Sequence, residues 1–228
     1  MSAQQPARPN LSGFWGAGHA VPIDPALVAK LPPNTVVVPD AGAPELPAGN
    51  YGGLRPTAAA LAAAKRWKPE DDMAIDRVCL PPSIVYAMQG PFPMEIHHAA
   101  ELIVMRLEYY DMVRVIFLDG RPHPPANAPH TKVGHSVGRW EGATLVVDTT
   151  HLSASTILNN GLAHSEKLHL IERFRLSPDG KMLLMQQEFE DAEALENRGA
   201  RFVGWDRGTD FIYPYECDPS FGANYNKK

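Results

Sequence analysis

Short runs of alternating apolar and polar residues fill the chain from Ile84 onward, and this alternation predicts β-strands. The runs are rich in Val, Ile, Leu, Phe and Tyr. Their predicted limits are residues 84–89, 94–98, 102–109, 113–118, 135–140, 144–149, 167–176, 182–190 and 201–205. Turn sequences separate many of them, and the glycines of Asp119-Gly120, Glu141-Gly142 and Asp179-Gly180 accept the positive φ of tight hairpins. Strands joined by these hairpins are therefore expected to be antiparallel.

The segment before these strands has a different character. Residues 1–82 hold much of the proline and glycine and few alternating runs, so we expect them to wrap around the strands. Within this segment, PTAAALAAAKRW at residues 56–67 predicts one short helix, with proline in its first turn and basic residues near its end. Residues 83–217 would form the sheet and residues 218–228 a tail. A chain of 228 residues fits one all-β unit, so we expect a single domain over residues 1–228.

About eight or nine antiparallel strands would leave two exposed sheet edges unless the sheet closed on itself. Closure into a barrel removes both edges and leaves room for one small ligand. We therefore predict an all-β, mainly antiparallel barrel with a ligand-sized interior. A two-sheet sandwich is the alternative.

Composition and charge limit the classes of partner and the compartment that we expect for this protein. The chain is 44% hydrophobic and 21% charged, with a formal net charge of -5, which gives no reason to expect nucleic acid or an anionic membrane as a partner. There is no apolar run of roughly 20 residues and no signal-peptide pattern, so we expect a cytoplasmic protein. Cys79 and Cys217 are too few for a disulfide framework, and we expect two buried free thiols. A homodimer is compatible with these features.

Histidines are the unusual feature, because eight of the nine fall between residues 97 and 169. They are His97, His98, His123, His130, His135, His151, His164 and His169. Carboxylates at Glu95, Asp148, Glu166 and Glu172 accompany them, and imidazole with carboxylate suits several transition metals. There is no HxH or HExxH spacing, however, and no nucleotide-binding motif. We expect neither a metal nor a cofactor, and surface or hydrogen-bonded histidines remain the alternative to a site.

Charged residues also interrupt apolar strands. Asp148 follows Leu145 to Val147, where an unpaired carboxylate would be costly, so we expect Arg139 or His135 to face it across the hairpin. A buried ion pair that fixes strand register and a catalytic role both remain open. Arg106, Arg114 and Glu172 could line a cavity. Met105 and Tyr109 could either form the wall of an aromatic-ligand site or pack the core.

Four segments of the sequence, taken together, resemble a known protein family. They are CLPPSIVYAMQGPFPMEI, FLDGRPHP, GHSVGRWEGATLVVDTT and HSEKLHLIERF. They resemble ordered blocks of a largely uncharacterised bacterial family of lipocalin-like, calycin-type barrels, over roughly residues 76–217. The sequence is also similar to cofactor-independent lyases of sphingomonad lignin catabolism, which remove formaldehyde or carbon dioxide from phenylcoumaran dimers. Many relatives carry a secretory leader, and its absence here agrees with an intracellular role. The resemblance implies a small aromatic substrate that is fragmented to a stilbene.

Such a fragmentation needs a base and a group that stabilises the departing phenolate. We expect His135 or His164 to be the base, oriented by Asp148 or Glu166, with Arg121 or Arg114 facing the phenolate. The predicted substrate contacts are His97, His123, His169, Arg139, Tyr109 and Met105. A non-catalytic lipocalin-like binder of a small apolar ligand and a histidine-ligated metalloenzyme are the alternative functions.

Overall fold

The structure, a computed structural model that describes residues 8–225, is built from short strands and even shorter helices. The strands are β1 (Gly13–Ala20), β2 (Thr35–Val37), β3 (Met94–His98), β4 (Leu102–Leu107), β5 (Val113–Phe117), β6 (His135–Glu141), β7 (Thr144–Thr150), β8 (Ser155–Leu158), β9 (Leu162–His164), β10 (His169–Leu176), β11 (Met182–Glu190) and β12 (Arg198–Gly208). The helices are α1 (Pro25–Val28), α2 (Ala58–Ala64), α3 (Pro69–Asp72), α4 (Ile84–Ala87) and α5 (Ser220–Tyr225), with a 3-10 turn at Tyr109–Asp111.

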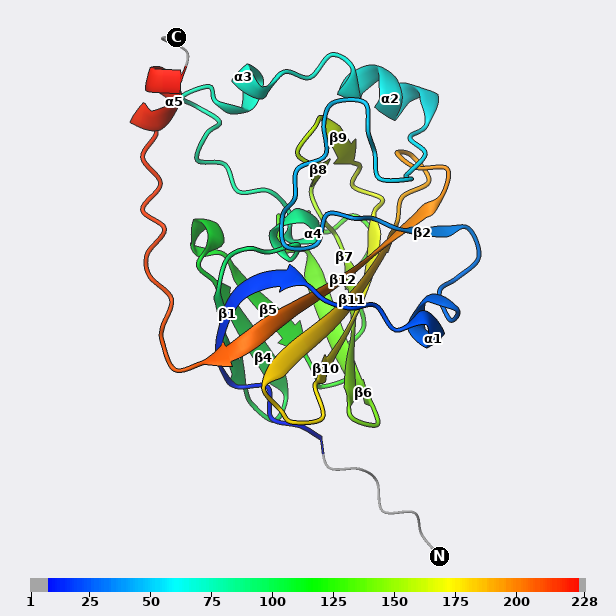
Figure 1. The fold of residues 1–228 in the computed structure, drawn as a ribbon, viewed down its shortest axis with the longest axis vertical. Helices are drawn as coiled ribbons and strands as arrows, with labels where there is room; N and C mark the ends of the chain where they lie inside the picture. Colours follow the sequence, from blue (N-terminus) through cyan, green and yellow to red (C-terminus); the bar gives the residue numbers. More distant parts are fainter. Residues whose placement is uncertain (1–7, 226–228) are drawn as a thin grey trace, which may run out of the picture.

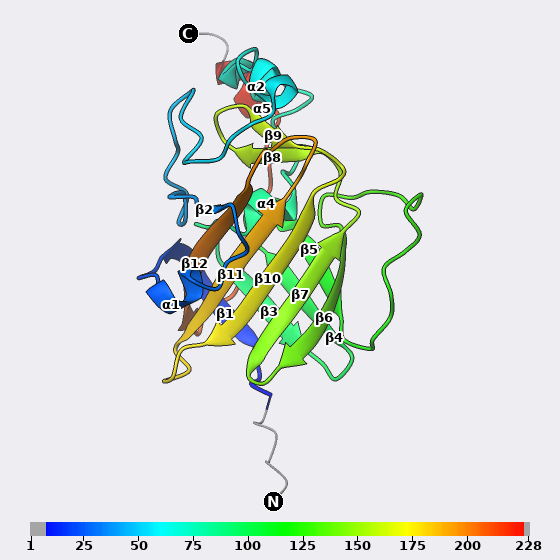
Figure 2. The same cartoon turned by 90° about the vertical axis from the view of Figure 1, so that its right-hand side faces the viewer.

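Nine strands close into a barrel. They hydrogen-bond in the order β1-β3-β4-β5-β6-β7-β10-β11-β12, and β12 pairs with β1 again (Figures 1 and 2). The β5–β6 pair is parallel and the other pairs around the barrel are antiparallel. β2 adds to β12 in parallel, and β8 and β9 form a separate hairpin. The predicted all-β barrel of about eight or nine strands is confirmed.

Period-two alternation explains why the strand predictions from residue 94 onward are confirmed to within a few residues. In β11, Leu183, Met185, Gln187 and Phe189 are buried, while the residues between them are partly exposed. The buried set faces the barrel interior, because successive side chains of a strand point to opposite faces. The strand predicted at residues 201–205 is longer, since β12 keeps seven successive buried residues, from Gly199 to Trp205.

The strand predicted at residues 84–89 is wrong, because this segment forms α4. Ile84, Val85, Ala87 and Met88 are all buried, so the segment is apolar on every side. A short apolar run of this kind cannot be assigned to strand or buried helix from periodicity alone. α4 lies near the end of the barrel where β8, β9 and α2 gather (Figure 2).

The predicted helix at residues 56–67 is confirmed over the shorter range of α2, where the Thr57 side chain accepts a hydrogen bond from the amide of Ala60. The other four helices have only four to six residues each and were not predicted. β1 was also missed, because its GFWGAGHA sequence is rich in glycine. It is nevertheless the strand that closes the barrel, so the N-terminal segment contributes a strand to the barrel in addition to wrapping around it.

The expectation of two free thiols is wrong. Cys79 and Cys217 form a disulfide with a Cα–Cα distance of 5.7 Å. It ties the segment after β12 to the segment before α4, across 138 residues of sequence. Sequence separation says nothing about this proximity, which depends on the path of the chain after the barrel has closed.

Large side chains point into the barrel interior. Fully buried residues include Trp15, Trp205, Phe174, Arg114 and Arg201. Their inward positions follow from the strand alternation. Among the described residues, no helix is both long and apolar enough to cross a membrane.

The two buried arginines are neutralised in separate ion pairs. Arg201 pairs with Asp40 of the wrapping segment through Nε and Nη2, at 2.8 Å from a carboxylate oxygen in each case. Arg114 pairs with Glu172. Gln187 connects the two pairs, because its amide donates to Glu172 and its oxygen accepts from Arg201. Such pairs must be complete, since removal of one partner leaves an uncompensated buried charge.

We expect Asp40→Ala to lower the free energy of unfolding by about 3–5 kcal/mol, because Arg201 would stay buried without its counter-charge. Urea denaturation followed by tryptophan fluorescence measures this. Glu141→Ala, which breaks the exposed pair with Arg139, is the control and should cost about 1 kcal/mol or less. Equal small losses in both variants would contradict the role of the buried pair.

Candidate functional site

Four of the predicted site residues meet on the outer wall of the barrel. His135 begins β6, Asp148 lies near the end of β7 and His169 begins β10, so antiparallel pairing brings these positions to one end of the sheet. His123 comes from the connection between β5 and β6. That connection must run the length of the barrel because the two strands are parallel, and it forms the long loop beside β6 in Figure 2.

These four residues form a continuous chain of contacts, which we call the His–Asp chain. Oδ1 of Asp148 lies 3.1 Å from Nε2 of His123 and 2.9 Å from Nε2 of His169. Nδ1 of His123 lies 3.2 Å from Nδ1 of His135. The side chains of His123, Asp148 and His169 are 24%, 29% and 38% exposed, so the chain is open to a ligand from solvent.

The hydrogen-bond pattern assigns the protons of the neutral chain. The carboxylate of Asp148 only accepts, so Nε2 of His123 and Nε2 of His169 donate to it. Nδ1 of a neutral His123 is then an acceptor, and both Nδ1–H of His135 at 3.2 Å and the Thr150 hydroxyl at 3.1 Å are placed to donate to it. When His135 is the donor, its Nε2 keeps a free lone pair, which is the requirement for a general base.

Neighbouring groups push the pKa values at the two ends of the chain apart. Burial lowers the pKa of His135 below its usual 6.5, and charge on nearby histidines and Arg121 lowers it further. The hydrogen bond to Asp148 raises the pKa of His169 against the opposing effect of burial. Burial alone would raise the pKa of Asp148, but its contacts with His169 and His123 outweigh burial and lower it. Opposite shifts in one site are typical of an acid and base pair.

Arg121 is the predicted cation that reaches this region. Its guanidinium lies 3.7 Å from the centroid of the Phe117 ring, and that ring stacks on His135 with 5.3 Å between centroids. Arg121 also pairs with Asp119. The guanidinium is therefore held beside the His135 end of the chain.

Asp148 itself faces outward, which corrects its expected partners. Val147 and Thr149 on either side of it are buried, so Asp148 points to the opposite face. The residue directly across the β6–β7 hairpin is Val137, and the carboxylate reaches His123 and His169 instead of Arg139 or His135. Asp148 therefore forms no buried ion pair with Arg139, and the buried ion pairs of the barrel are Arg114–Glu172 and Arg201–Asp40.

His164 lies in a different, buried place. Its Nε2 is 2.7 Å from Oγ of Ser83, and its Nδ1 is 2.8 Å from the carbonyl oxygen of Ser165. Nδ1–H therefore donates to the carbonyl and Nε2 accepts from the serine hydroxyl. Burial lowers the pKa of His164. Ser83 was missed because it only precedes an apolar run, and it is itself fully buried.

The remaining predicted residues are scattered over other parts of the barrel. Arg114 is inside the barrel, where it also donates to Ser136 and Thr149. Met105 packs in the core. The other contacts are those of Glu166 with His130, His97 with Glu95, Arg139 with Glu141, and Tyr109 with Phe92. The structure therefore brings together His135, Asp148, His123, His169 and Arg121, and separates the rest.

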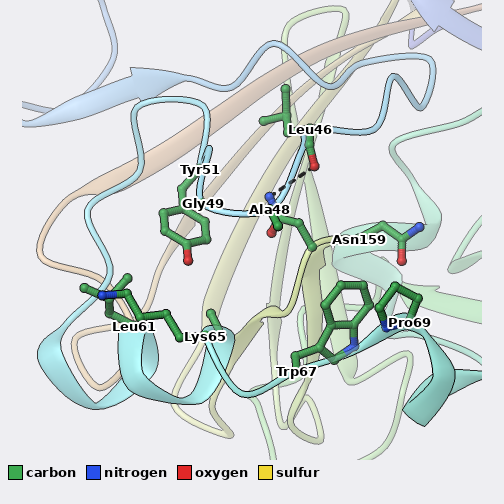
Figure 3. Close-up of a pocket in the computed structure, with 11 residues that line it drawn as sticks. Leu46, Ala48, Gly49, Tyr51, Leu61, Lys65, Trp67, Pro69 and Asn159 are labelled. Carbon is green, nitrogen blue, oxygen red and sulfur yellow. Dashed lines mark hydrogen bonds between the residues drawn. The ribbon is translucent and has the colours of Figure 1, made fainter.

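A ligand-sized cavity of about 540 Å³ lies outside the barrel (Figure 3). Its walls come from the loop at residues 46–51, from α2 and Trp67, and from the β8–β9 turn. None of the predicted site residues lines it. Sequence reasoning missed it because its walls come from three segments that meet only after folding.

Comparison with protein-family models, with curated proteins and with solved structures gave no match for this chain. Among residues 8–225, no group of three or more histidine, cysteine, aspartate or glutamate side chains is arranged to hold a metal ion.

The His–Asp chain predicts an order of titration. In histidine Cε1–H NMR spectra recorded across the range where imidazoles titrate, at about pH 5 to 8, we expect His169 to titrate above 6.5 and His135 below it. Asp148→Asn should bring the pKa of His169 down. Because the folded-state pKa is raised, the contribution of His169 to stability is complete below about pH 6.5 and is lost as pH rises through the folded value. The reverse order of titration would contradict the assigned roles.

Proposed function

We propose that the protein is a cofactor-independent lyase that uses the His–Asp chain for general acid and base catalysis on a small aromatic molecule. The observation that carries this proposal is the chain itself, which joins a histidine of lowered pKa to one of raised pKa through a shared carboxylate. The resemblance to phenylcoumaran lyases supports the substrate class. A barrel fold alone would support no particular chemistry.

The proposed reaction balances without an oxidant or reductant. With a phenylcoumaran alcohol, a base removes the hydroxyl proton, the bond to the hydroxymethyl carbon breaks and formaldehyde leaves. The released electron pair forms the stilbene double bond as the aryl ether bond breaks, and the phenolate takes up a proton. With the corresponding acid, loss of carbon dioxide supplies the same electron pair.

The residues of the site fit these two proton transfers. Nε2 of His135 would take the hydroxyl proton, and His123 holds that ring in the required tautomer. His169, whose pKa is raised by its hydrogen bond to Asp148, would donate to the phenolate. Arg121 would stabilise negative charge near His135. A phenol has a pKa of about 10, so one such hydrogen bond eases its departure near neutral pH.

The compartment stays a prediction. The sequence pattern predicts the cytoplasm, whereas disulfides such as Cys79–Cys217 are typical of oxidising compartments. Rapid alkylation of thiols before lysis of the native cells distinguishes the two. Two alkylated cysteines would support the cytoplasm, and none would place the folded protein in an oxidising compartment.

Turnover tests the proposal. We expect the purified protein to convert a phenylcoumaran alcohol or its acid to a stilbene, with release of formaldehyde or carbon dioxide. His135→Gln and Asp148→Asn should each lower kcat by about 10²- to 10⁴-fold, the usual contribution of a positioned acid or base. His97→Gln is the matched control, because His97 is exposed and lies outside the chain.

Folding of each variant is checked by circular dichroism before the rates are compared. Variants that fold and keep rates within a few-fold of the parent would contradict the assigned site. Binding of the substrate without any product would favour the non-catalytic binder. Activity that is lost on chelation and restored by a metal ion would favour the metalloenzyme.

A further inference from the structure

The cavity outside the barrel has walls that are fixed by hydrogen bonds. Nε1 of Trp67 donates to Asp72 at 2.7 Å, which holds the indole at the cavity. At the β8–β9 turn, the Asn159 amide donates to Glu45 at 2.6 Å. Figure 3 shows Tyr51 and Trp67 approaching the cavity from different segments. A site whose walls are already ordered loses little entropy when a ligand binds.

Asn160 fixes the loop at residues 46–51 and leaves one polar atom without a partner. Its Nδ2 donates to the carbonyl oxygen of Asn50 at 2.8 Å and lies 3.4 Å from those of Leu46 and Pro47. The opposite amide orientation would place Oδ1 against these three carbonyl oxygens, so the assignment is fixed. Asn160 is 3% exposed, and among the described residues Oδ1 has no hydrogen-bond donor. A buried acceptor of this kind calls for a donor from water or from a ligand.

The other lining residues indicate that the rest of the ligand is apolar and aromatic. Leu46, Tyr51, Leu61, Trp67 and Pro69 form a largely apolar and aromatic surface. A volume of about 540 Å³ is within the range of sites for small organic molecules, roughly 300–1,000 Å³. Aromatic residues on different walls suit a flat ring system, since offset stacking and edge contacts are both available.

Lys65 carries the one formal charge among the described residues that line the cavity. Two carboxylates lie next to lining residues, but Asp72 accepts from Trp67 and pairs with Arg77, and Glu45 accepts from Asn159. Lys65 has no ion-pair partner within residues 8–225, so its charge is available to an anionic substituent. The ligand would then combine a flat apolar body, an acidic group and a hydrogen-bond donor.

We propose that this cavity is a binding site for an aromatic acid that also carries a hydroxyl group, with the hydroxyl donating to Asn160 and the acid near Lys65. The cavity shares no residue with the His–Asp chain, so this site is independent of the proposed lyase activity.

Binding of 6-hydroxy-2-naphthoate, measured by calorimetry and by quenching of the tryptophan fluorescence to which Trp67 contributes, tests the site. 6-Methoxy-2-naphthoate lacks the donor and should bind about five- to tenfold more weakly. Lys65→Gln should weaken the parent ligand about two- to fivefold, as expected for a partly exposed ion pair. Arg66→Gln removes the same charge from the next residue, outside the lining, and should bind as the wild type does.

Ala48→Trp places a large ring in the mouth of the cavity and should abolish binding. Ala62→Trp is its control, because Ala62 is also exposed but does not line the cavity. The lyase assay on the same variants should be unchanged, which separates failure of this site from failure of the proposed activity. Absence of binding to the wild type, or equal binding by Ala48→Trp and Ala62→Trp, would overturn the proposal. Equal affinity for the hydroxy and methoxy ligands would overturn the role of Asn160.

Discussion

Arg201 lies wholly buried inside the barrel and hydrogen-bonds to four other segments of the chain. Its guanidinium contacts Asp40 of the wrapping segment, Gln187 of β11, the carbonyl oxygen of Val85 in α4 and that of Ile157 in β8. A buried guanidinium has to be neutralised and hydrogen-bonded, so none of these segments can move away independently. This one side chain therefore holds α4 against the barrel and fixes the β8–β9 hairpin whose turn lines the cavity.

The candidate chemistry lies on the outer wall of the barrel. Phe174, Trp205 and the two paired arginines are buried on the inner side of the same strands. Because side chains alternate along a strand, the other residues of the same strands face outward. On this outer face Asp148 contacts the imidazole of His169 in β10 and that of His123 in the β5–β6 connection. The parallel β5–β6 pair matters because it forces that connection to run along the wall, which carries His123 to the carboxylate.

Sequence reasoning could predict the parts of this structure that depend on local alternation. The barrel strands between residues 94 and 190 follow from it, and so does the barrel, because that many strands need to hide their edges. The helix follows from its alanine-rich composition, whereas β8 and β9 were missed. Sequence reasoning could not show that Asp148 faces outward, since either face of a strand can be the buried one until its neighbours are known. α4, the Cys79–Cys217 bond and the partnership of Arg201 with Asp40 depend on where distant segments meet, and no local pattern carries that information.

The pH dependence of stilbene formation by the wild type and by Asp148→Asn tests whether the His–Asp chain supplies both the acid and the base. We expect a bell-shaped kcat profile for the wild type, in which the rate rises as His135 loses its proton and falls as His169 loses its own. In Asp148→Asn the descending limb should move to lower pH, because His169 would no longer be held protonated by the carboxylate. A descending limb at the same pH in both proteins, or a rate independent of pH across the imidazole range, would contradict the assignment of the acid and base to this chain.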